Sequence, residues 1–111
     1  MNQDNRRISA APAIDVRNTR RLHIQLTGAV QGVGFRPFVH NLATSLQLTG
    51  WVINDERGVT IEVEGSPGQL DTFERKLITE HPPLAMIISR ETTTLDPVKF
   101  TGFQIRESRD T

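Results

Sequence analysis

The sequence predicts an α+β domain in which two helices cover one face of a four-stranded antiparallel sheet. Three observations lead to this fold class: stretches in which apolar and polar residues alternate, two longer stretches with apolar residues at helical spacing, and the order of these stretches along the chain. The order is strand, helix, strand, strand, helix, strand, followed by a short extra strand. A chain of 111 residues has the length of one such domain.

The first strand and the first helix are separated by a loop that contains glycine. Residues 22–27 alternate between apolar and polar side chains, as in a half-buried strand. The helix is expected over residues 37–47, and Pro37 suits its first turn because the N–H that proline lacks would have no partner there. Steps of three and four residues place six apolar residues on one stripe: Phe35, Phe38, Val39, Leu42, Ala43 and Leu46.

A hairpin and the second helix follow. Residues 51–53 and 59–64 are predicted as two strands joined by a short polar turn, with Glu62 and Glu64 on the solvent face of the second strand. Ser66 is expected to cap the helix, together with Pro67 in its first position and Gln69 in a capping box. The buried stripe of this helix comprises Leu70, Phe73, Leu77 and Ile78.

The C-terminal part of the chain completes the fold. Pro82-Pro83 ends the second helix, and residues 85–94, rich in Ile and Thr, are predicted as the fourth strand. A short extra strand is expected around Phe103 and Ile105, running to about Arg106. This order of elements is that of the ferredoxin-like βαββαβ plait.

The composition is that of an ordinary globular protein, with 36% hydrophobic and 23% charged residues. Thirteen Lys and Arg residues balance thirteen Asp and Glu residues, so neither nucleic acid nor a membrane surface is expected as a partner. No stretch resembles a membrane span or a signal peptide. The sequence has no cysteine, which excludes disulfides and favours the cytoplasm.

The domain is expected to span residues 21–107, between a polar, disordered N-terminal arm at residues 1–20 and a short tail at residues 108–111. The three histidines fall in three different elements, with no spacing typical of a metal site. No metal and no cofactor is therefore expected for this domain.

The loop from Gly28 to Val39 (GAVQGVGFRPFV) has the features of an anion site. Gly32 and Gly34 leave room for a ligand close to the backbone, and N–H groups at a helix start attract anions. Arg36 offers a fork of donors suited to two phosphate oxygens, and no carboxylate lies between Gly28 and His40. These residues alone leave two alternatives open, an anion-binding loop and a purely structural turn.

A resemblance to a known family bears on this choice. Residues 30–36 (VQGVGFR) resemble the acylphosphatase signature, and residues 50–54 (GWVIN) resemble the second motif of that family; the similarity covers about residues 21–107. The resemblance implies that Arg36 and Asn54 are catalytic, the arginine binding the phosphate and the asparagine positioning the attacking water. It also implies that phosphate, or sulfate in its place, is bound by the loop residues Gln31, Gly32, Val33, Gly34, Phe35 and Arg36.

The residues that follow Arg36 indicate which kind of acylphosphatase-like protein the sequence resembles. Ordinary small acylphosphatases do not usually have proline at that point, whereas this sequence continues Pro37-Phe38-Val39. The longer string is similar to the N-terminal acylphosphatase-like domain of the hydrogenase maturation carbamoyltransferases. This similarity implies hydrolysis of carbamoyl phosphate to carbamate and phosphate. It further implies zinc-finger-like and carbamoyl-transfer domains downstream in a longer parent chain, and a hydrogenase maturation protein as partner.

A function of a different class remains as the alternative, a non-catalytic anion-binding or docking module of a larger protein, since plaits of this kind also serve such roles. Arg36 together with Asn54 favours the enzyme, because a docking module has no need of an amide that positions water.

Overall fold

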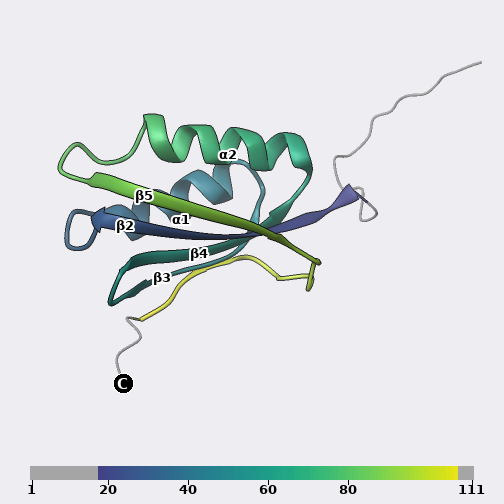
Figure 1. Cartoon of the computed structure of the whole chain (residues 1–111). Helices are drawn as coiled ribbons and strands as arrows, with labels where there is room; N and C mark the ends of the chain where they lie inside the picture. Colours follow the sequence, from purple (N-terminus) through teal and green to yellow (C-terminus); the bar gives the residue numbers. More distant parts are fainter. Residues whose placement is uncertain (1–17, 108–111) are drawn as a thin grey trace, which may run out of the picture.

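The computed structural model describes residues 18–107, and within them two helices lie on one face of a five-stranded sheet (Figure 1). The α+β plait with both helices on one face is confirmed. The proposed arm and tail, residues 1–20 and 108–111, lie outside the described residues except for residues 18–20, of which Arg20 already begins the first strand. The elements in chain order are β2 (Arg20–Ala29), α1 (Phe35–Ser45), β3 (Thr49–Asp55), β4 (Gly58–Gly65), α2 (Pro67–Thr79), β5 (Met86–Leu95) and β6 (Phe103–Ile105).

The strand order in the sheet is β5-β2-β4-β3-β6. The first four strands pair antiparallel, as predicted, whereas β6 pairs with β3 in parallel. The sheet therefore has five strands with one parallel pair, which corrects the expectation of a four-stranded antiparallel sheet. The reason is the path of residues 96–102, which lead from β5 at one edge of the sheet to the other edge. There the chain forms β6 beside β3 (yellow in Figure 1).

Helix α1 begins at Phe35, two residues before the predicted start at Pro37. Gly34 has a left-handed φ of 81° and forms the N-cap, so the helix begins directly behind the glycine. Pro37 is then the third helical residue, still within the first turn, where a missing N–H removes no hydrogen bond. In α2, Ser66 is the N-cap and Pro67 the first helical residue, as predicted.

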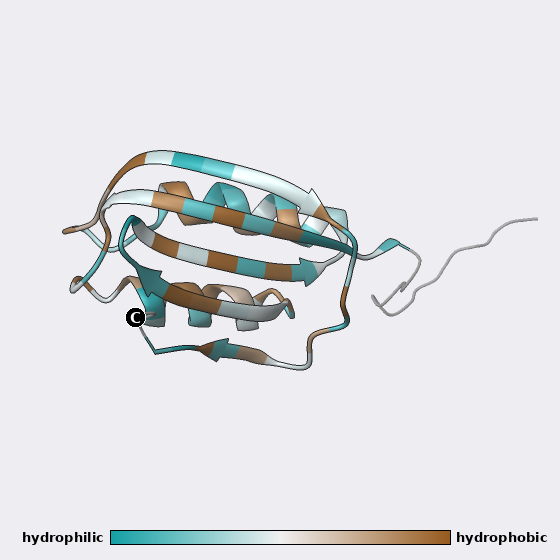
Figure 2. Cartoon of the chain, turned by 60° about the horizontal axis from the view of Figure 1, so that its bottom comes forward, coloured by the Kyte–Doolittle hydropathy of each residue, from teal (hydrophilic) through white to brown (hydrophobic). Residues whose placement is uncertain are grey.

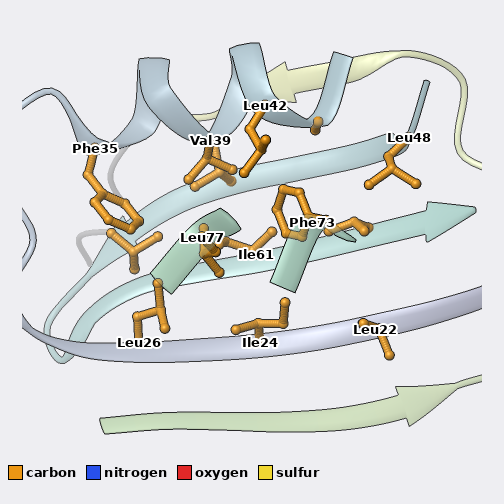
Figure 3. Close-up of a cluster of buried hydrophobic side chains, with 14 of the residues drawn as sticks. Leu22, Ile24, Leu26, Phe35, Val39, Leu42, Leu48, Ile61, Phe73 and Leu77 are labelled. Carbon is orange, nitrogen blue, oxygen red and sulfur yellow. The ribbon is translucent and has the colours of Figure 1, made fainter. Parts of the chain in front are cut away.

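The hydrophobic core lies between the sheet and the two helices, and apolar and polar residues alternate along the strands that face it (Figure 2). Side chains of α1, β2 and α2 meet there in one cluster, which includes Phe35, Val39 and Phe73 (Figure 3). Phe73 is fully buried, and burial of a side chain of this size contributes about 1.5–3 kcal/mol. Ile78, predicted in the buried stripe of α2, is 39% exposed.

The opposite face of the sheet contains charged residues that are buried, which corrects the expectation for Glu62 and Glu64. Glu62 is only 8% exposed because Arg21 and His23 cover its carboxylate, each at 2.8 Å. Glu64 is 4% exposed, and its carboxylate accepts the backbone N–H groups of residues 98–100. The segment between β5 and β6 is thus attached to the sheet through Glu64.

Candidate active site

A cleft with a volume of about 140 Å³ lies between the loop after β2, the first turn of α1 and the end of β3. This volume is well above the roughly 10–15 Å³ that one water molecule needs. Arg36 and Asn54, the two residues predicted to be catalytic, both line it. The complete lining is Val30, Gly32, Gly34, Phe35, Arg36, Pro37 and Asn54.

Two glycines of the loop, Gly32 and Gly34, line the cleft and have a left-handed backbone conformation. Gly32 has φ 73° and Gly34 has φ 81°, a region in which residues with a side chain are strained. A Cβ atom added at either position would meet no atom within 4 Å. Glycine is therefore required at these two positions by the backbone conformation. There would be room for a side chain at both. Left-handed residues in such a turn direct successive N–H groups to a common side, as in anion-binding nests.

The start of α1 presents unpaired donors to the cleft. Its N-cap, Gly34, provides no side-chain hydrogen bond, and no acidic residue lies in the first turn. In the described part of the chain, the backbone N–H groups of residues 32–36 take part in no hydrogen bond. The N-terminus of a helix carries about half a positive elementary charge. This end of the helix therefore favours an anion.

The guanidinium of Arg36 adds a full positive charge to this region. Its Nη1 donates a hydrogen bond of 2.9 Å to the backbone carbonyl of Arg106, just after β6. Within residues 18–107, no carboxylate lies within ion-pair distance of Arg36. A guanidinium has five N–H donors, and the carbonyl that holds this one is neutral. The charge of Arg36 and most of its donors are thus left for a ligand.

Asn54, at the end of β3, also lines the cleft. Its Oδ1 is buried and has no hydrogen-bond partner among the described residues. A buried polar atom without a partner costs about 1–3 kcal/mol. A ligand or water that donates a hydrogen bond to Oδ1 would remove this cost.

Two residues of the predicted phosphate loop, Gln31 and Val33, do not line the cleft. Val33 is partly buried against the core. The side-chain amide of Gln31 donates to the carbonyls of Asp55, at 2.5 Å, and Gly58, at 3.1 Å. Gln31 therefore ties the loop to the turn between β3 and β4, beside Asn54. Nothing in the local sequence indicates this contact, because the residues it joins are far apart along the chain.

The carboxylate of Asp55 is engaged in that same turn. It accepts hydrogen bonds from the backbone N–H groups of Arg57, at 2.9 Å, and Gly58, at 3.0 Å, and from the Thr60 hydroxyl, at 2.5 Å. Partial burial raises the pKa of Asp55, but the hydrogen bond from Thr60 and those from the two backbone groups lower it by more, so the net pKa is below its ordinary value. Asp55 does not line the cleft, so its negative charge belongs to the turn.

No group of three or more His, Asp or Glu side chains within residues 18–107 is arranged to hold a metal ion. Neither helix of this range is long and apolar enough to cross a membrane.

Several known proteins are similar to this chain. A carbamoyltransferase HypF of Rhizobium leguminosarum bv. viciae is 46% identical over 89 residues, which cover 80% of this chain and 12% of that protein. An acylphosphatase of Caldivirga maquilingensis is 40% identical over 89 residues, which cover 78% of this chain and 93% of the other. The crystal structure of full-length HypF in a phosphate- and nucleotide-bound form superposes with a TM-score of 0.79 at 34% identity, covering 83% of this chain and 12% of that one.

The similarity to HypF carbamoyltransferases is confirmed, and the chain spans about 12% of the length of the first of these relatives. Residues 22–105, which include every residue that lines the cleft, match the acylphosphatase family. With the fold, the loop of residues 30–36 and the similarity to whole acylphosphatases in agreement, this chain belongs to the acylphosphatase family.

Proposed function

We propose that the chain binds acyl phosphates in the cleft and hydrolyses them, with carbamoyl phosphate as its substrate. One observation carries the proposal: Arg36, the donor-rich start of α1 and Asn54 line one cleft, and among the described residues the guanidinium has no carboxylate partner and the buried Oδ1 of Asn54 has no hydrogen-bond partner. Phosphoryl transfer requires mainly the positioning of reactants and the stabilisation of negative charge. The cleft contains groups suited to both tasks.

The phosphate would be held by the loop and by Arg36. The backbone N–H groups of residues 32–36 would surround its oxygens, with the positive end of the helix behind them. Two N–H groups of the Arg36 guanidinium would bind two phosphate oxygens in the bidentate manner. Gln31 would act indirectly, because its hydrogen bonds to the β3–β4 turn hold the loop in place.

Asn54 would orient the attacking water: its buried Oδ1 has no hydrogen-bond partner within residues 18–107 and would accept one O–H of that water. The water oxygen then bonds to phosphorus, the bond between phosphorus and the acyl oxygen breaks, and carbamate leaves with the electron pair. One proton of the water stays on the new phosphate oxygen and a substrate oxygen takes up the other. An acyl phosphate has a good leaving group, so the reaction does not require a strong general acid.

The choice of carbamoyl phosphate is supported by the relatives, several of which are named carbamoyltransferase HypF and are much longer than this chain. By analogy, this domain would supply carbamate to carbamoyl-transfer domains of a longer protein, and a hydrogenase maturation protein would receive the carbamoyl group. Whole acylphosphatases are similar as well, which supports hydrolysis by a domain of this size alone.

The proposal is tested by incubating the protein separately with carbamoyl phosphate and acetyl phosphate and measuring the release of inorganic phosphate. We expect release above the spontaneous rate, faster with carbamoyl phosphate. No release, combined with a melting temperature that still rises with added phosphate, would indicate an anion-binding module without catalysis. No release and no effect of phosphate on the melting temperature would contradict both functions.

A further inference from the structure

Arg106, a residue outside the motifs and outside the lining of the cleft, contacts both Arg36 and strand β3. Its backbone N–H donates to the carbonyl of Val52 in β3, at 2.9 Å. Its carbonyl accepts the hydrogen bond from Nη1 of Arg36, also at 2.9 Å. Its guanidinium lies over the ring of Trp51, 4.7 Å from the ring centre. Arg106 thus connects β3 directly to the side chain that is proposed to bind phosphate.

The segment that precedes Arg106 is attached to the sheet by hydrogen bonds at its beginning and in its middle. We call residues 96–106 the C-terminal strap. At its beginning, the buried Glu64 carboxylate accepts the backbone N–H groups of Val98, Lys99 and Phe100, the last two at 3.1 and 3.0 Å. In its middle, the Gly102 carbonyl accepts the N–H of Gly50 at 2.9 Å. The strap therefore has a defined path before it reaches Arg106.

The strap also contacts the helix that contains Arg36. The rings of Phe103 in β6 and His40 in α1 meet edge to face, with centres 6.0 Å apart. Phe103 is buried, whereas Arg106 at the end of the strap is exposed. Among the described residues, the contact that holds the exposed side chain of Arg106 on the sheet is the cation–π contact with Trp51.

We infer that Arg106 is a positioning residue, which orients the guanidinium of Arg36 for an anion through its backbone carbonyl and is itself held by Trp51. This inference rests on the proposed function. A carbonyl is suited to the task because it fixes one N–H of Arg36 without neutralising the positive charge, as a carboxylate would. A flexible side chain that is already oriented loses less conformational entropy when its ligand binds.

The test measures the dissociation constant of inorganic phosphate together with kcat and KM for acetyl phosphate. We expect Arg106→Ala to weaken phosphate binding about two- to fivefold, the range that corresponds to an exposed cation–π contact. Arg106→Lys retains a cation that can lie over Trp51 and is expected to restore most of the affinity. The control is Arg75→Ala, which removes the same charge from an exposed position on α2 outside the cleft lining and should bind phosphate like the wild type.

A double-mutant cycle separates positioning from a general effect on the fold. In an Arg36→Lys background there is no guanidinium to orient, so adding Arg106→Ala should leave the dissociation constant unchanged. An equal loss in both backgrounds, or a loss no larger than that of Arg75→Ala, would overturn the inference. Failure of the proposed function would look different, because the wild type would then neither bind phosphate nor release it from acetyl phosphate.

Discussion

Arg36, in the first turn of α1, and Asn54, at the end of β3, line the same cleft. The topology explains why. Strands β2 and β3 each pair antiparallel with β4 and so run in the same direction. Helix α1 connects them and has to run back along the sheet. The start of the helix and the end of β3 therefore lie at the same end of the sheet, which brings the two motifs together.

Arg36→Ala is expected to lower kcat/KM for acyl phosphates at least about a hundredfold, the typical loss when a donor to a developing negative charge is removed. The fold should persist, because the side chain is only half-buried and, within residues 18–107, its one hydrogen bond goes to the carbonyl of Arg106. The measurement is phosphate release, with circular dichroism and thermal unfolding as controls. Wild-type turnover in the folded variant would contradict the role of Arg36.

Asn54→Ala is expected to lower kcat more than it lowers the affinity for inorganic phosphate, because the amide is proposed to hold the water and not the phosphate. The free energy of unfolding should not fall by more than about 1 kcal/mol, since among the described residues the buried Oδ1 has no hydrogen-bond partner to lose. Steady-state kinetics measures kcat, and a phosphate titration measures the affinity for inorganic phosphate. Equal losses in kcat and in affinity would show that Asn54 does not act on the water.

Gly34→Ala is expected to destabilise the protein by about 1 kcal/mol and to weaken phosphate binding, because its φ of 81° strains any residue with a side chain. Gly68→Ala is the matched control. At both glycines an added Cβ meets no atom within 4 Å, but Gly68 lies in α2 and is not among the residues with positive φ. That substitution should stabilise the protein by about 0.4–1 kcal/mol. Urea unfolding of the two variants measures the contrast, and changes of the same sign would contradict the account of Gly34.

Asp55→Asn tests the carboxylate in the β3–β4 turn through its dependence on pH. The pKa of Asp55 is lowered in the folded state, so its contribution to stability is present above the unfolded pKa, which is close to 3.8, and is lost as the pH falls through the lower folded pKa. We expect the variant to be less stable than the wild type at pH 7, with a smaller difference at pH 2.5. Urea unfolding at both values checks this, and a difference that does not depend on pH would contradict it.

Much of the candidate site could be read from short stretches of sequence. The loop of residues 30–36 combines two glycines with an arginine directly before a helix, and these residue types favour an anion whatever surrounds them. The start of the helix was predicted two residues too late, because the left-handed conformation of Gly34, which begins the helix, depends on the folded loop. Glu64 was placed on the solvent face because alternation along a strand does not show which distant segment will cover it.

The sequence by itself determined the elements and their order, since each follows from periodicity, capping and turn preferences over a few neighbouring residues. Arg36 and Asn54 were indicated as site residues by the resemblance of their motifs to those of acylphosphatases. Only the tertiary structure decided that β6 pairs in parallel with β3, that Gln31 holds the β3–β4 turn, and that the carbonyl of Arg106 accepts a hydrogen bond from Arg36. These contacts join residues far apart along the chain, and all three use backbone carbonyls, which every residue has. No local pattern distinguishes such a carbonyl from any other until the chain is folded.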